Sequence, residues 1–176
     1  MPLPTAHVDL VARTRSGDVA ALTELYERYG NALMALAYRL TGSQADAEDV
    51  LHDVFLGLPE ALAKYDERGS LESWIKRVTA RVALTKLRSR RREREVDLDD
   101  VHIAPESGAM HRLTDLVAVQ RAIDALPDSL RAVFVLREVE GYSHAEIAAL
   151  LEISTNASEV RLHRAIRALR QTLGTD

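Results

Sequence analysis

The chain contains no cysteine, so disulfides, thiolate metal sites and a thiol redox switch within it are excluded. Aromatic residues make up only 5% of its 176 residues. No segment shows the strict alternation of polar and apolar residues that is typical of a β-strand. No apolar run approaches the ~20 residues of a membrane-spanning helix. The N-terminal residues lack the basic start and apolar run of a secretory signal, so we expect a cytoplasmic protein.

Patterns of catalytic and metal-binding residues are also missing. The six histidines form no pair at metal-ligand spacing within a predicted helix, and there is no glycine-rich phosphate loop. Ser154 and Ser158 have no evident base in the sequence to activate them. We therefore expect no catalytic residue, no metal, no cofactor and no enzymatic activity. A helical nuclease would need a carboxylate cluster, and the available acids do not all share one helical face: Asp46, Glu48, Asp49 and Asp53.

Apolar residues at spacings of three and four are what the chain does have, and they predict an all-α fold. A short helix is expected near 7–15. A long amphipathic helix follows Asp18 and ends at Thr41–Gly42.

Buried stripes can be predicted for the helices that follow. A further helix opens at Ser43 or Gln44. Its buried stripe is predicted to contain Ala47, Val50, Leu51, Val54, Phe55 and Leu58. The helix after Ser70 has its core stripe at Leu71, Trp74, Ile75, Val78 and Val82. Near the C-terminus, Pro127 opens a helix expected to turn Leu130, Val133, Phe134 and Val139 inward.

The net charge of −4 hides a strong segregation of charge along the chain. Between Lys76 and Arg94 there are nine basic residues and a single acidic one, Glu93. Such a one-sided run favours binding to phosphates over a surface balanced by salt bridges. Acidic residues gather near residues 46–53 and again near 95–100. This pattern predicts basic faces for one partner and an acidic face for another.

One face of the helix after Ser43 carries Asp49, His52, Asp53 and Leu56, which a helix places side by side. Two interpretations remain open. Acids near a helix start are stabilised by the helix dipole, which needs no partner. The dipole does not account for Leu56, an apolar residue among acids. That mixture is what a docking face for a basic partner helix would contain.

The apolar pattern stops between about residues 95 and 112, where Pro105, Gly108 and several acids occur. We read this as an acidic flexible linker between two small helical domains, at 1–94 and 113–176. Helical spacing returns after Thr114, with Leu116, Val119 and Ile123.

The stretch 141–170 predicts two short helices with a tight joint. Ser143 and Glu146 have the spacing of a capping box, and residues 152–154 leave room only for a turn. Ser154 can cap a second helix, whose other face carries Arg161, Arg164, Arg167 and Arg170. This is the sequence form of a helix-turn-helix. An ordinary helical hairpin with solvated arginines is the alternative.

Several motifs together resemble the extracytoplasmic-function (ECF) group of bacterial RNA polymerase sigma factors, in the sigma-70 family. The motifs are SGDVAALTELYERYG, DAEDVLHDVFLGL, LESWIKRV with its basic run, LPDSLRAVFVLREVEGYSHAEIAALLEIS and VRLHRAIRALR. The resemblance covers nearly the whole chain. It implies an alternative sigma factor that binds core polymerase and directs it to specific promoters. The N-terminal domain would correspond to region 2 and the C-terminal domain to region 4.

The resemblance also implies partners and roles. The expected partners are core RNA polymerase (β′ clamp helices and β flap), promoter DNA and an anti-sigma factor. Docking on core polymerase would involve Asp49, His52, Asp53 and Leu56. The promoter −10 element would be bound by Tyr65, Arg68, Lys76, Arg77, Arg81, Lys86, Arg88 and Arg91. The −35 element would be bound by Ser143, Thr155, Asn156, Ser158, Glu159, Arg161, His163 and Arg164.

This chain departs from the family pattern at several positions. The family commonly has Gln at position 52, Asn at 81 and Asp at 85, where this chain has His52, Arg81 and Thr85. It often has Val and Lys in place of Ser158 and Glu159. These departures bear on sequence preference. They also leave open an alternative, a sigma-like decoy that sequesters an anti-sigma factor without recognising promoters.

Overall fold

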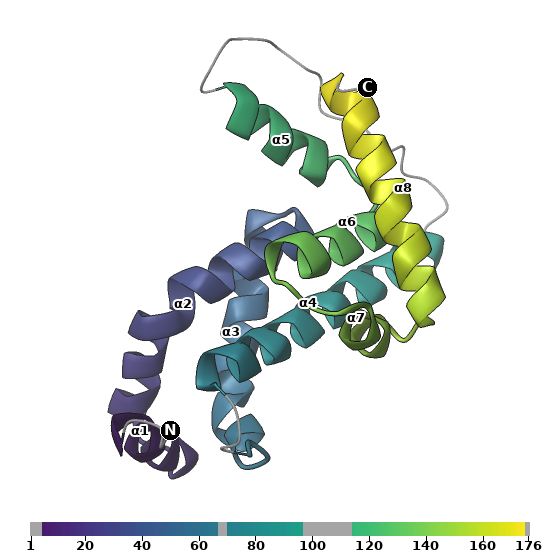
Figure 1. The fold of residues 1–176 in the computed structure, drawn as a ribbon. Coiled ribbons are helices and arrows are strands. Elements are labelled where there is room, and N and C mark those ends of the chain that lie inside the picture. The colour runs from purple at the N-terminus through teal and green to yellow at the C-terminus, as the bar shows by residue number, and fades with distance from the viewer. Residues whose placement is uncertain (1–4, 67–69, 97–113, 175–176) are drawn as a thin grey trace. The chain divides into compact units, whose positions relative to one another are not determined.

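The computed structural model describes residues 5–66, 70–96 and 114–174, and within these ranges it contains helices and no strand (Figure 1). The expected linker at 95–112 lies almost entirely outside the described residues. The chain divides into two compact units, Met1–Lys86 and Leu87–Asp176. The helices in order are α1 (Thr5–Arg15), α2 (Val19–Thr41), α3 (Gln44–Leu62), α4 (Leu71–Val96), α5 (Thr114–Asp124), α6 (Asp128–Phe134), the π-helical turn η1 (Val135–Val139), α7 (His144–Leu151) and α8 (Thr155–Leu173).

The first unit is built on the pairing of α2 with α3, and α1 packs on both (Figure 1). Asp18 caps α2 by accepting hydrogen bonds from the backbone N–H groups of Ala20 and Ala21. Gly42 closes the helix in the left-handed conformation, at φ 67°. Both helix limits agree with the sequence prediction. The leucines of α2 at positions 25, 33, 36 and 40 are fully buried, as periodic spacing requires of a core face.

Helix α3 begins at the predicted cap, where the Ser43 hydroxyl accepts a hydrogen bond from the Asp46 N–H at 3.3 Å. All six residues of its predicted stripe are buried. Arg15 of α1 reaches the C-terminal end of α3, where it donates to the carbonyl oxygens of Leu62 and Tyr65 at 2.8 and 2.9 Å. These bonds satisfy two backbone acceptors where the helix ends and the next segment begins.

The second unit packs α8 against α5, α6 and α7. Arg131 is buried at the joint between α5 and α6, where it donates to the carbonyl oxygens of Asp124 and Leu126 and pairs with Asp128 at 2.6 Å. These bonds close the turn between α5 and α6, and the sequence analysis did not predict them.

The helix opened by Pro127 ends in a π-helical turn, η1, that was not expected. Val139 was predicted to face inward and is instead 46% exposed, so that assignment was wrong. A turn closed by i→i+5 hydrogen bonds holds more residues than an α-turn, which rotates the residues after it around the helix axis. Gly141 follows with φ 75°, a conformation that favours glycine.

Candidate polymerase and nucleic-acid interface

Helix α3 displays the four residues proposed for docking on one exposed face. Asp49, His52 and Asp53 are exposed, and Leu56 is 68% exposed. The opposite side of the same helix is the buried stripe. The face therefore offers two carboxylates, an imidazole and an unpartnered apolar side chain. This combination suits a partner surface that carries both positive charge and apolar contacts.

Asp49 and Lys86 were assigned to different surfaces, and the structure joins them. The Lys86 Nζ donates to the Asp49 Oδ2 at 2.6 Å, which ties α4 to α3. The hydrogen bond from Lys86, and then its charge, hold the pKa of the Asp49 carboxyl below its ordinary value of 3.8. Lys86 is therefore engaged within the first unit, whereas Asp53 forms no ion pair with the residues that the structure describes.

The basic face of α4 contains the residues proposed for the −10 element. Arg77, Arg81 and Arg91 are exposed, and Arg88 is half-exposed. Lys76 pairs with Glu72 on the same helix at 3.2 Å. Arg68 lies outside the described residues. The exposed arginines leave a basic face along α4 that suits a polyanionic partner.

Tyr65 was proposed to capture bases, and its environment does not fit that role. Its side chain is only 7% exposed, and its ring lies 5.1 Å from the Trp74 ring, centroid to centroid. A base cannot stack on a ring face that the protein already covers. We therefore assign Tyr65 and Trp74 to the packing between the α3–α4 segment and α4, and we leave Tyr65 out of the proposed interface.

Helices α7 and α8 form the predicted helix-turn-helix. The Ser143 hydroxyl accepts from the Glu146 N–H, and the Glu146 carboxylate accepts from the Ser143 N–H, so the capping box is complete. Glu152 adopts the left-handed conformation, at φ 56°, in the joint. Ser154 caps α8 through the Ala157 N–H at 3.1 Å. The Ser143 hydroxyl also donates to Glu146 at 2.8 Å, so this proposed DNA contact is already used within α7.

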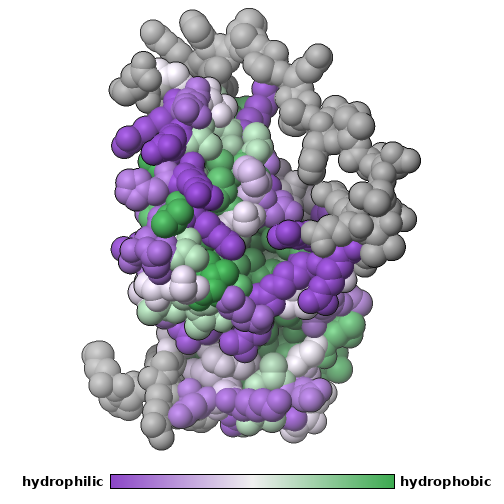
Figure 2. Space-filling view, turned by 90° about the vertical axis from the view of Figure 1, so that its right-hand side faces the viewer, coloured by the Kyte–Doolittle hydropathy of each residue, from purple (hydrophilic) through white to green (hydrophobic). Residues whose placement is uncertain are grey.

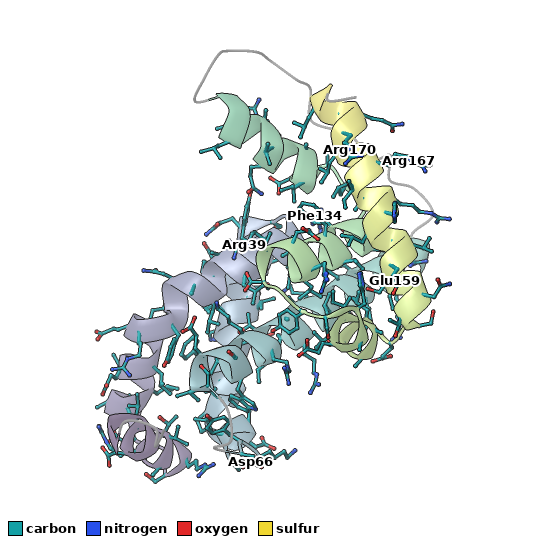
Figure 3. The ribbon with its side chains drawn as sticks, in the orientation of Figure 1. Arg39, Asp66, Phe134, Glu159, Arg167 and Arg170 are labelled. Atoms are coloured by element: carbon teal, nitrogen blue, oxygen red, sulfur yellow. The ribbon has the colours of Figure 1, made fainter. Side chains whose placement is uncertain are left out.

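The outer face of α8 carries most of the residues proposed for the −35 element. Thr155, Asn156 and Glu159 are exposed in its first turns, and His163 and Arg164 follow on the exposed side. Arg161 is half-buried. Glu159 and Arg167 mark two points along this helix in Figure 3. Figure 2 looks onto the side of Figure 1 where α8 lies and shows mainly hydrophilic residues, with hydrophobic ones between them.

A shallow hollow of about 340 Å³ runs along this face of α8. It is lined by Asn156, Glu159, Val160, His163, Arg164 and Arg167. Val160, at 40% exposure, was not among the predicted residues. Its spacing of four from Asn156 and from Arg164 would have placed it on the same face. An exposed valine there adds an apolar surface to a face otherwise made of polar and charged groups.

Ser158 was proposed to contact the −35 element, but it does not lie on the exposed face of α8. Its side chain is fully buried, and its Oγ lies 2.9 Å from the Nδ1 of His144. A residue buried between α7 and α8 cannot present its hydroxyl to a base edge. The sequence analysis placed Ser158 among the residues expected to bind the −35 element, and its burial rules out that direct contact.

Two searches of the described residues bear on other kinds of function. In those ranges no three His, Asp or Glu side chains come together in a way that would hold a metal ion. None of the helices there combines the length and apolar character needed to span a bilayer.

Comparison with known proteins matches each half of the chain to a sigma-factor family. Sigma-70 region 2 matches residues 25–93, and Sigma-70, region 4 matches residues 116–169. SigE of Mycolicibacterium smegmatis, an ECF RNA polymerase sigma factor, is 34% identical over 90% of this chain and 65% of its own length. The chain therefore spans just under two thirds of that relative. CarQ of Myxococcus xanthus, an RNA polymerase sigma factor, is 31% identical over 92% of this chain and 94% of its own.

Solved structures agree in fold. The sigma factor RpoE of Bartonella quintana, in complex with the anti-sigma factor NepR, superposes with a TM-score of 0.65 at 21% identity, over 88% of this chain and 97% of RpoE. CnrH, in complex with the cytosolic domain of CnrY, superposes with a TM-score of 0.58 at 28% identity. The match covers 95% of this chain and 96% of CnrH. The two helical units and the helix-turn-helix define a two-domain transcription factor. The chain belongs to the ECF RNA polymerase sigma factors.

Proposed function

We propose that this sigma factor binds core RNA polymerase through the exposed face of α3 and directs it to promoters through α4 and α8. The observation that carries the proposal is the capped helix-turn-helix, whose second helix leaves Asn156 and Glu159 exposed in its first turns. N-terminal residues of the second helix are the ones that meet base edges in the major groove. The protein would act as a specificity subunit without chemistry of its own, in the cytoplasm where polymerase and promoters meet.

The −35 element would be read by residues at the start of α8. Asn pairs in bidentate fashion with adenine, and Glu accepts from the amino group of cytosine, so Asn156 and Glu159 are the proposed readers. Thr155 lies at the helix start, where backbone N–H groups face a phosphate. Arg161, His163 and Arg164 would contact phosphates or guanine.

The −10 element would be held by the basic face of α4. Arg77, Arg81 and Arg91 supply charge for the backbone of the separated strand, which gives affinity without sequence information. Arg88 is proposed for the same role, which would require it to leave the Glu152 carboxylate and the Leu150 carbonyl oxygen, to which it donates at 3.1 and 3.0 Å. Core polymerase would meet Asp53, His52 and Leu56 on α3, with its β′ clamp helices as the basic partner, and the second unit would meet the β flap.

A protein regulator is also proposed. RpoE and CnrH were each solved with a protein bound, and the ECF relatives make an anti-sigma factor the expected partner here. No observation on the described residues favours the decoy, which would keep the anti-sigma contact and lack promoter recognition.

Run-off transcription with core polymerase tests the proposed function directly. In a library of promoters, core polymerase with the wild-type chain is expected to produce transcripts only from those with particular −35 and −10 sequences. Core polymerase alone is expected to produce none of these. A chain that binds core polymerase and selects no promoter would overturn the proposal in favour of the decoy.

Asp53→Lys tests the docking face through co-purification with core polymerase. Like charge set against a basic partner costs several kcal/mol at an interface, so co-purification with core polymerase is expected to fail. Asp53 is the better probe because changing Asp49 would also break the tie to Lys86. Glu27→Lys, on an exposed position of α2, makes the same charge change away from the face and is expected to bind normally. Equal binding by both variants would remove α3 from the proposal.

A further inference from the structure

Ser158 occupies a position in α8 where a hydroxyl is unexpected. It lies at the start of the second turn and is fully buried, while Asn156 and Glu159 on either side are exposed. Burying a hydroxyl without a hydrogen bond costs free energy that an apolar side chain at the same place would not incur. The hydroxyl is paired instead with the imidazole of His144, at 2.9 Å between Ser158 Oγ and His144 Nδ1.

His144 is held firmly at the other end of this bond. It is the first residue of α7, directly after Ser143, and the capping box of Ser143 and Glu146 fixes the backbone there. The bond therefore links the N-terminus of α7 to the second turn of α8. The turn at residues 152–154 links the opposite end of α7 to the start of α8. Two links at opposite ends of α7 fix the angle between the helices more tightly than the turn alone.

The bond is directional, unlike the contact of two apolar side chains. A neutral imidazole nitrogen either donates or accepts, and the serine hydroxyl can take the complementary role in either case. Bond strength falls steeply as the angle departs from linearity. A rotation of α8 about its own axis would weaken the bond, whereas a packed apolar pair would tolerate a small rotation. The pair thus resists the motion that would turn Asn156 and Glu159 away from a groove.

We infer that His144 and Ser158 are positioning residues that set how α8 presents Asn156 and Glu159 to the bases of the −35 element. This inference rests on the proposed function of α8. Neither residue touches DNA in this role. Base recognition requires hydrogen bonds of fixed geometry, whereas long arginine side chains reach phosphates from a range of helix orientations. Loss of the bond reduces discrimination between base sequences and leaves the phosphate contacts in place.

The test measures binding of the full chain to a library of −35 variants at one salt concentration, together with the salt dependence of binding. Ser158→Ala and His144→Phe each remove the bond. We expect each to reduce discrimination between the best and the poorer sites by about tenfold, the scale of one base contact, with an unchanged salt slope. His144→Asn places an amide where Nδ1 stood and is expected to restore discrimination. The double variant is expected to be no worse than either single one, because both remove the same bond.

Thr172→Ala is the matched control. It also removes a hydroxyl from α8, one that donates to the Ala168 carbonyl of the same helix at 3.0 Å. It is expected to leave the ranking of sites intact. Ser158→Val, which fills the buried position with an apolar side chain, serves if Ser158→Ala fails to fold. Circular dichroism and thermal unfolding of each variant establish that the protein measured is folded.

Two negative results are distinguishable. A folded wild-type chain without any −35 preference would overturn the proposed function of α8. In the other case the wild-type chain has a clear −35 preference. If its folded His144→Phe and Ser158→Val variants then keep the same ranking of −35 sequences and the same spread of affinities, the positioning role alone is overturned. A loss of stability with the ranking intact counts as the second result, because a purely structural bond would produce it.

Discussion

Asp49 and Lys86 form an ion pair of 2.6 Å between α3 and α4, and this pair constrains both side chains. Lys86 Nζ is used by a carboxylate of its own unit, so a role in binding DNA would require this bond to break. The Asp49 carboxylate is largely exposed, which keeps the contribution of the pair to stability small. The pair is therefore better understood as a link between two helices than as half of either proposed binding surface.

The pH dependence of unfolding tests the pair. Because Lys86 lowers the pKa of Asp49 in the folded state, the stabilisation is present above the ordinary pKa of 3.8 and is lost as pH falls through the lowered value. Lys86→Met is expected to be less stable than wild type at about pH 6, and the difference is expected to shrink as pH falls below 3.8. Urea unfolding at a series of pH values measures this. Lys64→Met, at an exposed position, is the control, and a difference from wild type that persists in acid would contradict the prediction.

Glu159 gives a second prediction at the level of a single residue. Its carboxylate lines the hollow on α8 beside His163 and Arg164. A negative charge at this position weakens phosphate binding, so a base contact is the role proposed for it. Glu159→Lys adds two units of positive charge and is expected to tighten non-specific DNA binding. It is also expected to lose preference for cytosine at one position, by roughly 1–3 kcal/mol.

The control for Glu159→Lys separates charge from recognition. Glu138→Lys, at an exposed position of η1, adds the same charge away from the reading face of α8. It is expected to leave the order of preferred −35 sequences unchanged in the same library. If Glu159→Lys also strengthens all sequences equally and keeps their order, Glu159 does not read a base.

At the scale of the helix, the N-terminal cap of α8 makes a measurable contribution. The Ser154 hydroxyl satisfies the Ala157 N–H, one of the orphan donors of the first turn. Ser154→Ala is expected to destabilise the protein by about 0.5–2 kcal/mol, and Ser154→Asp to retain most of the stability because Asp also caps. Chemical unfolding followed by circular dichroism measures both. Equal stability of the alanine and wild-type proteins would show that the cap contributes little here.

Several helix limits and the buried stripe of α3 were predictable because they depend on neighbours in sequence. Asp18, Ser43 and Ser154 are caps whose partners lie two or three residues away, and each was predicted. The stripe of α3 follows from the helical period alone. The capping box of α7 and the turn at 152–154 follow from spacing in the same way.

Contacts between helices were not predictable from local pattern. The Asp49–Lys86 pair joins residues 37 positions apart, and the His144–Ser158 bond joins residues 14 apart on two helices. The burial of Tyr65 against Trp74 depends likewise on how a segment folds back on α4. Val139 was misassigned because one π-helical turn changes the period on which the prediction rested. Ser158 was expected to contact the −35 element, and the packing of α8 against α7 buries it.

At the scale of the whole molecule, two compact units share one chain whose charge is unevenly distributed. The boundary between the units falls at Lys86–Leu87, inside α4, whereas the sequence predicts a boundary after residue 94. The segment 97–113 connects α4 to α5 along the chain. It keeps a surface proposed for the −10 element and a surface proposed for the −35 element on the same molecule.

Covalent connection of the surface on α4 to the surface on α8 predicts a loss when the chain is cut between them. With one surface bound to a promoter, the other is held at a high effective concentration, which raises overall affinity by about 10²–10⁴-fold over either surface alone. A protease site inserted within 97–113 and then cleaved is expected to leave two pieces that retain helical circular dichroism. The concentration needed for half-maximal run-off transcription is expected to rise by about 10²–10⁴-fold. The same insertion left uncut is the control for effects of added length. If the cleaved pieces direct transcription at the concentration of the intact chain, the two surfaces do not act together on one promoter.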